Sequence, residues 1–344
     1  MKPMTSLEDI EKLKIEEGRL LHSATHEEIL SAATTDVYFL RTMDLLKKMD
    51  LDKSIVTAEI FARRPGVFCG IEEVKNILRD KDVEVWSVDE GETFEEKETL
   101  VRIKGPYSNF GAYETIILGS LASASGWATA SREIKEACGE KSFLCFGARH
   151  VHPAVAPVME RAALIGGANG ASCVLAAKMM HIGASGTLPH AAMLIAGDTL
   201  KIAKVYDQVM PEDHKRIVLV DTFKDEVEES IRIASELKER LFGIRLDTPS
   251  ERGGVTPHLV RELRSKLDHA GFQYVKIFVS GGLSPDKIRA LSAAGADSFG
   301  VGSYISGASA IDMTMDIKEV NGEAVAKRGR LPGLIDNPKL KKMK

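Results

Sequence analysis

Residues 274–303 read YVKIFVSGGLSPDKIRALSAAGADSFGVGS, and this stretch sets the plan for the larger part of the chain. It contains an apolar strand, a helix that opens with Ser284 and Pro285 and closes at Gly295, and a second strand at 298–302. Serine is a favoured N-cap, proline suits the first helical turn, and glycine commonly follows a helix end. Apolar strands on both sides of a helix are typical of parallel strands with covered faces, so the stretch predicts a β-α-β unit.

The same alternation of short apolar strands and amphipathic helices begins at Lys141. Further strands are predicted at 142–147, 217–221 and 242–246, and a long helical stretch of small residues is predicted to reach about Met180. About six strand–helix units favour a TIM-like (β/α) barrel in an α/β protein over an open sheet. The pattern leaves open whether the barrel is complete or incomplete.

The N-terminal part of the chain has a different pattern. Residues 83–105 contain short alternating segments with turn glycines and no helical period, which is typical of a small antiparallel β element. A long apolar helix is predicted over 111–137. We expect residues 1–125 to form a mixed α/β cap domain and residues 126–310 to form the barrel, with the tail 311–344 packing back on the cap.

Composition and charge exclude several classes of protein. The chain has 344 residues, of which 44% are hydrophobic and 28% charged, with a formal net charge of −4, so it can bury a core. It has no basic face of the kind that binds nucleic acid. No apolar run approaches the length of a membrane span, and the polar N-terminus lacks the apolar core of a signal peptide. We therefore expect a cytoplasmic protein that binds neither nucleic acid nor membranes.

The four cysteines give no sign of a metal site. Cys69, Cys138, Cys145 and Cys173 form no CxxC pair and adjoin no cluster of cysteine and histidine. In a reducing cytosol they are expected to be small buried residues rather than zinc ligands or disulfides. No metal-ligating residue is therefore predicted.

Polar residues and glycines follow nearly every predicted strand. Because the carboxyl ends of parallel barrel strands share one rim, residues that follow different strands meet there. The residues concerned are Arg149, His150, His152, Thr187, His190, Asp221, Thr222, Arg245, Asp247, Gly281, Gly282, Gly302 and Ser303. Packing alone does not account for this repeated placement, which predicts an active site at the rim.

Two adjacent units end in glycine-rich loops, SGG at 280–282 and GVGS at 300–303. Glycine lets backbone N–H groups approach phosphate oxygens, and a helix N-terminus adds positive potential. The alternative is a pair of tight turns that need glycine for a positive φ. Since the loops occur in adjacent units, phosphate binding is favoured, and we expect the three glycines Gly281, Gly282 and Gly302, with Ser303, to hold the phosphate of a mononucleotide or sugar phosphate.

Motifs spread over most of the chain resemble those of one enzyme family. They are TTDVYFLRTM (34–43), GAYETIILGSL (111–121), FGARHVHP (146–153), ERAALIGGANGAS (160–172), GTLPHA (186–191), VDTFKDE (220–226), GIRLDTPSERGG (243–254), VSGGL (279–283) and FGVGS (299–303). In this order they resemble the nicotinate phosphoribosyltransferases, which are type II phosphoribosyltransferases. The resemblance implies an enzyme of NAD salvage that transfers the phosphoribosyl group of phosphoribosyl diphosphate to nicotinate, giving nicotinate mononucleotide and diphosphate.

The resemblance also implies co-substrates and catalytic roles. ATP hydrolysis would be coupled to the reaction through phosphorylation of His190, whose ring Asp221 would orient. Mg²⁺ would be held mainly by diphosphate oxygens and water. Arg245 and Asp247 would contact the ribosyl and phosphate groups, and these four residues form the expected catalytic set. The alternative for His190 is a core histidine satisfied by a backbone group.

Four residues are expected to bind the substrates. Phe146 would stack on the pyridine ring, although it could equally be a core aromatic residue. Arg149 would bind the nicotinate carboxylate or the diphosphate through two parallel hydrogen bonds. Thr187 is also expected to bind the substrates. By resemblance, Tyr38 would reach the pyridine from a neighbouring subunit. This implies a homo-oligomer, dimeric or larger, with shared active sites.

Two alternatives stay open because several motifs depart from the family pattern. His150 stands where the family often has a second arginine, and Lys224 replaces an acid. One alternative is quinolinate phosphoribosyltransferase, which decarboxylates its substrate and needs no ATP. The glycine pair in ERAALIGGANG (160–170) resembles that enzyme, but HVHPAV (150–155) replaces its basic segment. The other alternative is a non-catalytic nucleotide-binding relative.

Overall fold

The structure is a computed structural model that describes residues 2–344. The chain divides into two compact units, which we call the first unit (residues 2–129 with 309–344) and the second unit (residues 130–308). The division falls inside the long helix α6 (Glu114–Cys138), and the predicted boundary at residue 125 lies in the same helix. Within residues 2–344, no helix is long and apolar enough to cross a membrane.

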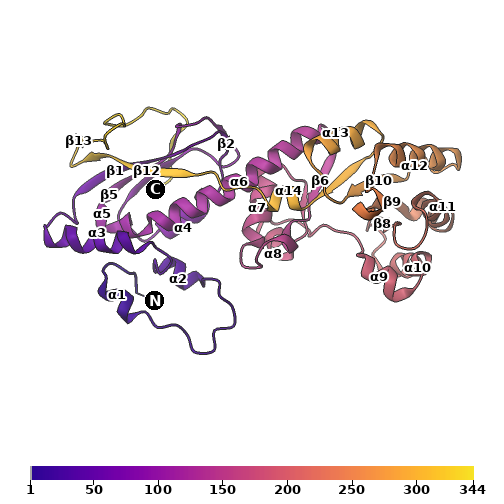
Figure 1. The fold of residues 1–344 in the computed structure, drawn as a ribbon, viewed down its shortest axis with the longest axis horizontal. Helices are drawn as coiled ribbons and strands as arrows, with labels where there is room; N and C mark the ends of the chain where they lie inside the picture. Colours follow the sequence, from indigo (N-terminus) through magenta and orange to yellow (C-terminus); the bar gives the residue numbers. More distant parts are fainter. Residues whose placement is uncertain (1) are drawn as a thin grey trace. The chain divides into compact units, whose positions relative to one another are not determined.

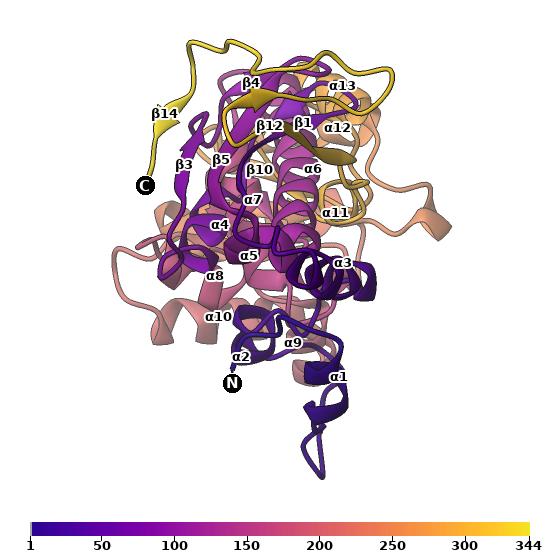
Figure 2. The same ribbon diagram turned by 90° about the vertical axis from the view of Figure 1, so that its left-hand side faces the viewer.

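The first unit is built on an antiparallel sheet with the strand order β13-β12-β1-β5-β3-β14. Its central strand β1 pairs with β5 on one side and with β12, from the C-terminal tail, on the other (Figure 1). At one edge, β14 pairs with β3 (Figure 2). The strands are β1 (Ile55–Ala62), β3 (Glu84–Ser87), β5 (Thr99–Pro106), β12 (Met313–Val320), β13 (Glu323–Ala324) and β14 (Lys341–Lys342), with a separate pair of β2 (Gly66–Val67) and β4 (Thr93–Phe94).

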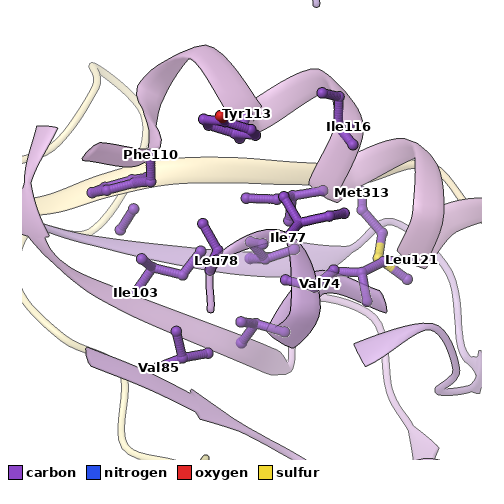
Figure 3. Packing of buried hydrophobic residues seen from close by; sticks show 14 of the residues in the cluster. Val74, Ile77, Leu78, Val85, Ile103, Phe110, Tyr113, Ile116, Leu121 and Met313 are labelled. Atoms are coloured by element: carbon purple, nitrogen blue, oxygen red, sulfur yellow. The ribbon is translucent and has the colours of Figure 1, made fainter. Parts of the chain in front are cut away.

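The core of the first unit lies between this sheet and its helices. Val74 and Ile77 of α4 pack in one buried cluster with Ile103 of β5 and with Phe110 and Tyr113, which precede α6 (Figure 3). Burial of such side chains stabilises the unit by roughly 1.5–3 kcal/mol each. The helices are α1 (Glu8–Lys12), α2 (His26–Leu30), α3 (Val37–Lys48), α4 (Ile71–Ile77), α5 (Tyr107–Phe110) and the N-terminal part of α6.

The second unit contains a six-stranded, wholly parallel sheet with the order β7-β6-β11-β10-β9-β8. The strands at Arg216–Leu219 and Ser298–Val301 are buried at every residue, as expected for parallel strands covered on both faces. The strands of the sheet are β6 (Ser142–Cys145), β7 (Gly170–Ala171), β8 (Arg216–Leu219), β9 (Leu241–Leu246), β10 (Lys276–Ser280) and β11 (Ser298–Val301). The connecting helices are α7 (Ala156–Gly166), α8 (Val174–Met179), α9 (His190–Ala196), α10 (Thr199–Val209), α11 (Glu226–Leu237), α12 (Pro257–His269), α13 (Pro285–Ala293) and α14 (Ser303–Ser306).

The predicted α/β fold with a TIM-like parallel sheet is confirmed, and the sheet is a half-barrel. Its edge strands are β7 and β8, which do not pair with each other in the part of the chain that the structure describes. Helix α13 begins as predicted, with the Ser284 side chain accepting a hydrogen bond from Lys287 N and Pro285 in the first turn. The stretch predicted as one helix to Met180 is instead broken, because Gly167 has a φ of 119° and ends α7.

Candidate active site

A pocket of about 570 Å³ lies at the carboxyl ends of the strands of the second unit. Its wall includes every residue that was assigned a catalytic, substrate-binding or phosphate-binding role except Asp221 and Tyr38. Of the other strand-end residues, His152 and Thr222 do not line it. The predicted residues that line it are Phe146, Arg149, Thr187, His190, Arg245, Asp247, Gly281, Gly282, Gly302 and Ser303. The fold thus brings together residues from loops that are far apart in the sequence.

His190 and Asp221 form a pair at one side of this pocket. His190 is the first residue of α9, and its Nε2 lies 3.0 Å from Oδ2 of Asp221, which follows β8. The Asp221 side chain is fully buried, whereas 37% of the His190 side chain is exposed. Burial raises the pKa of Asp221, and the hydrogen bond from His190 partly opposes this rise. With Asp221 ionised, Nε2–H donates to it and Nδ1 carries the free lone pair.

This pair answers the question whether His190 is a core residue. A core histidine would be buried and satisfied by a backbone group, but the ring of His190 is partly exposed and bonded to a carboxylate. The other carboxylate oxygen, Oδ1 of Asp221, is buried and has no hydrogen-bond partner within residues 2–344. The arrangement can therefore accept, donate or hold a proton at the pocket wall.

A second polar network crosses the pocket floor. Arg245 of β9 donates from Nη1 to Thr187 Oγ1 and, over 3.4 Å, from Nη2 to Asp247 Oδ2. Ser280, the last residue of β10, donates to Asp247 Oδ1 over 2.9 Å. Burial lowers the pKa of Arg245, and Asp247 and then Asp221 oppose this shift. Sequence reasoning assigned no role to Ser280, although its place directly before the glycine pair was a usable signal.

The two glycine-rich loops need glycine for different reasons. Gly281 and Gly282 have φ angles of 96° and 58°, which side chains rarely adopt, so their loop depends on glycine for its conformation. At Gly300 an added Cβ would lie 2.3 Å from Cε2 of Phe146, and at Gly302 it would lie 2.7 Å from Cε1 of His150. In the second loop glycine therefore makes room for two rings.

The loop after β6 supplies the aromatic and basic wall of the pocket. Phe146 is half-buried against Gly300, while Arg149 and His150 are exposed in a short 3₁₀ helix (Ala148–His150). The Nδ1 of His150 lies 3.3 Å from Ser306 Oγ. Basic groups thus face the pocket from two sides, which suits a ligand that carries several negative charges.

Tyr38 does not belong to this pocket. It lies on α3 in the first unit, where its ring packs on that of Phe39 with 4.2 Å between centroids. Its residue exposure is 53%, so much of the ring is free of contacts. Its predicted contact with a neighbouring subunit's substrate remains a prediction.

Comparisons with known proteins identify the family. The N-terminal domain model of quinolinate phosphoribosyl transferase matches residues 36–125, and its C-terminal domain model matches residues 127–316. The crystal structure of nicotinate-nucleotide pyrophosphorylase from Pyrococcus furiosus shares 44% sequence identity with this chain, with a TM-score of 0.88. It covers 92% of this chain, which in turn covers 82% of that chain.

More distant similarities extend the comparison. The nicotinate-nucleotide pyrophosphorylase from Ehrlichia chaffeensis has a TM-score of 0.64 at 18% identity, covering 86% of this chain and 100% of that chain, and shows the shared fold alone. The nicotinate phosphoribosyltransferase of Bacillus subtilis (strain 168) is 34% identical over 229 residues, which make up 64% of this chain and 45% of that protein. The chain spans about half the length of the curated relatives it matches.

The assignment to the nicotinate phosphoribosyltransferase family is wrong, because both matching domain models belong to the quinolinate family. Nicotinate as acceptor, and ATP with a phosphorylated His190, are overturned with it, since the quinolinate enzymes decarboxylate their substrate and need no ATP. The motifs misled because the two enzyme types are related, and motifs expected for a phosphoribosyl site do not separate them. With residues 36–125 and 127–316 matched, the chain belongs to the quinolinate phosphoribosyl transferase family.

Proposed function

We propose that the second unit transfers the phosphoribosyl group of phosphoribosyl diphosphate to the ring nitrogen of quinolinate, releasing diphosphate and CO₂ and leaving nicotinate mononucleotide. No ATP takes part. The observation that carries this proposal is the pocket itself, in which Arg149, Arg245, His150 and His190 line one cavity with the glycine loop at 281–282. A pyridine dicarboxylate and a sugar diphosphate are both strongly anionic, and such a wall suits both.

The proposed chemistry makes modest demands on the protein. The C1′–O bond to diphosphate breaks, the pyridine nitrogen bonds to C1′, and catalysis comes mainly from positioning and charge stabilisation. The bond from C2 to its carboxylate then breaks, leaving its electron pair at C2, where a proton is taken up. Arg245, fixed by Thr187 and Asp247, is placed to bind an anionic group, and His190 with Asp221 to handle protons.

Mg²⁺ fits this site as a partner of the diphosphate. Within residues 2–344, no three histidine, cysteine, aspartate or glutamate side chains are grouped to hold a metal ion. Asp247 contributes a carboxylate to the pocket wall, and hard oxygen ligands from diphosphate and water would supply the rest. The metal would neutralise charge on the leaving group.

The proposal includes a homo-oligomer in which Tyr38 contributes to the active site of a neighbouring copy. Its half-exposed ring supports this assignment. The proposal also keeps a cytoplasmic location, which the free thiols of Cys138, Cys145 and Cys173 support.

The test is to incubate the full chain with Mg²⁺, phosphoribosyl diphosphate and either quinolinate or nicotinate, with and without ATP. Mononucleotide is measured by mass and CO₂ by release from carboxyl-labelled quinolinate. We expect one CO₂ per mononucleotide from quinolinate, at a rate that ATP does not change. Turnover of nicotinate alone would overturn the proposal.

A matched pair of variants ties the activity to the pocket. Arg245→Lys removes a planar fork that bonds Thr187 and Asp247, so kcat/KM should fall by about 10- to 100-fold. Arg289→Lys is the control, because the Arg289 side chain is 58% exposed, forms an ion pair with Asp286 and lies outside the pocket. Equal effects of the two variants would contradict the assigned site.

A further inference from the structure

We infer that Glu160 is a positioning residue, a buried carboxylate that fixes the two loops carrying Arg149 and Ser172 on the pocket wall. The inference rests on the proposed function for the identity of the substrate. Glu160 does not line the pocket itself, so any effect on substrate must pass through these loops.

The carboxylate joins two segments that are separate in the sequence. Glu160 lies on α7 and is 0% exposed. Its Oε1 accepts hydrogen bonds from Ala148 N at 3.1 Å and from Ser172 Oγ at 2.7 Å. Its Oε2 accepts one from Cys173 N at 2.6 Å. One side chain therefore ties the loop after β6 to the loop after β7.

Packing alone does not explain a carboxylate at this position. The rest of the buried face of α7 is made of small and apolar side chains, including Met159, Ala162 and Ala163. Burying a charge costs several kcal/mol unless hydrogen bonds compensate, so an apolar residue would fill the space at lower cost. Three hydrogen-bond donors converge on Glu160, which indicates that its role in the fold is to accept these hydrogen bonds.

The sheet gives these loops little support of its own. Strand β7 has only two residues, Gly170 and Ala171, and forms the edge of the half-barrel. Short edge strands with few pairing bonds open more easily than central ones. Ser172 follows this strand directly, and its N–H still donates to Cys145 O over 3.1 Å. Beyond that bond, Glu160 anchors the segment through Ser172 Oγ and Cys173 N. In the loop after β6, Gly147 lies so close to α7 that an added Cβ would be 2.7 Å from Met159 Cε.

The consequence for substrate is positional. Ala148 is the first residue of the 3₁₀ helix (Ala148–His150) that contains Arg149. The hydrogen bond from Ala148 N–H to Glu160 therefore fixes the backbone position from which the Arg149 side chain extends. A guanidinium binds a carboxylate or phosphate as a fork only when its orientation is fixed. Loss of the Glu160 bonds should therefore weaken anion binding more than it slows the chemical step.

The decisive variant is Glu160→Gln, which keeps the size but places an NH₂ group against one of three donors. We expect a folded protein whose KM for quinolinate rises about tenfold while kcat changes by less than about threefold. Glu229→Gln is the matched control. Glu229 is also buried on a helix, at 1% exposure, but it pairs with Arg232 and lies outside the pocket wall. An unchanged KM in Glu160→Gln would overturn the inference.

A second comparison keeps the inference testable if Glu160→Gln does not fold. Glu160→Asp retains the charge, and Ser172→Ala removes one donor. Each should raise the KM for quinolinate above the wild-type value. Ser172→Ala should have no further effect in the Glu160→Asp background, because the shortened side chain has already lost its bond to the hydroxyl. Additive effects of these two substitutions would count against a shared hydrogen bond.

Binding of inorganic diphosphate, measured by calorimetry on the same proteins, separates this inference from the proposed function. If the wild-type chain turns over no quinolinate, the proposed function fails. A tenfold weaker affinity of Glu160→Gln for diphosphate would then still support the positioning role, and equal affinity would overturn it.

Discussion

Replacing Gly300 by alanine should displace the Phe146 ring. Gly300 is buried in β11, and an added Cβ would lie 2.3 Å from Cε2 and 2.6 Å from Cδ2 of that ring. Non-bonded carbon atoms are most favourable at about 3.5–4.0 Å, so the ring must move by roughly 1 Å or more. Overpacking of this kind costs about 1–3 kcal/mol. Because Phe146 also lines the pocket, its movement should raise the KM for quinolinate.

The assay is urea unfolding of four proteins, namely wild type, Gly300→Ala, Phe146→Ala and the double variant. Gly300→Ala should lower the free energy of unfolding by about 1–3 kcal/mol in the wild-type background and by less than about 1 kcal/mol when Phe146 is alanine. Gly183→Ala is the control, because an added Cβ there meets nothing within 4 Å. The reasoning is refuted if Gly300→Ala costs the same with and without the Phe146 ring.

Three further predictions follow from charge and backbone conformation. Burial raises the pKa of Asp221, so Asp221→Asn should leave thermal stability at pH 7 unchanged or higher while quinolinate turnover falls at least about tenfold, since the asparagine cannot stabilise a positive His190. Burial, with Asp316, raises the pKa of Glu114 from 4.5 to about 7. The stability linked to this group is complete below pH 4.5 and is lost as pH rises through 7, so thermal unfolding should show Glu114→Gln to be the more stable protein above pH 7, with the difference shrinking at lower pH. Gly281→Ala forces a side chain into a φ of 96°, which should cost about 1–2 kcal/mol in urea unfolding and raise the KM for phosphoribosyl diphosphate.

The sequence motifs did not distinguish between nicotinate and quinolinate as the pyridine acceptor. The glycine loops, Asp247 and Arg245 are proposed to bind the phosphoribosyl group, which nicotinate and quinolinate enzymes both transfer. The two acceptors differ by one carboxylate, whose binding depends on how basic side chains from separate loops converge. The segment HVHPAV (150–155) does not show in sequence how those side chains converge. The matches of two domain models, over residues 36–125 and 127–316, placed the chain in the quinolinate family.

Local patterns were sufficient for most of the second unit. Strands such as β10 and β11 are continuous apolar runs, and their helices carry capping residues, so elements and order could be read from residues 274–303 alone. Because the carboxyl ends of parallel strands share one rim, residues such as Arg245 were predicted to meet there, and they line the pocket. These features depend on neighbouring residues and on the fixed geometry of parallel β-α-β units.

Long-range pairing was decided only by the tertiary structure. The tail 311–344 was expected to pack on the cap, but nothing in the sequence showed that β12 would pair with β1, because antiparallel partners are chosen by whole buried faces. The opening between β7 and β8, the contact of Phe146 with Gly300 and the three bonds that converge on Glu160 likewise join distant segments. The sequence by itself determined which elements form and which residues meet at the rim. Only the tertiary structure decided how those side chains are held, because that depends on contacts between residues that no local pattern relates.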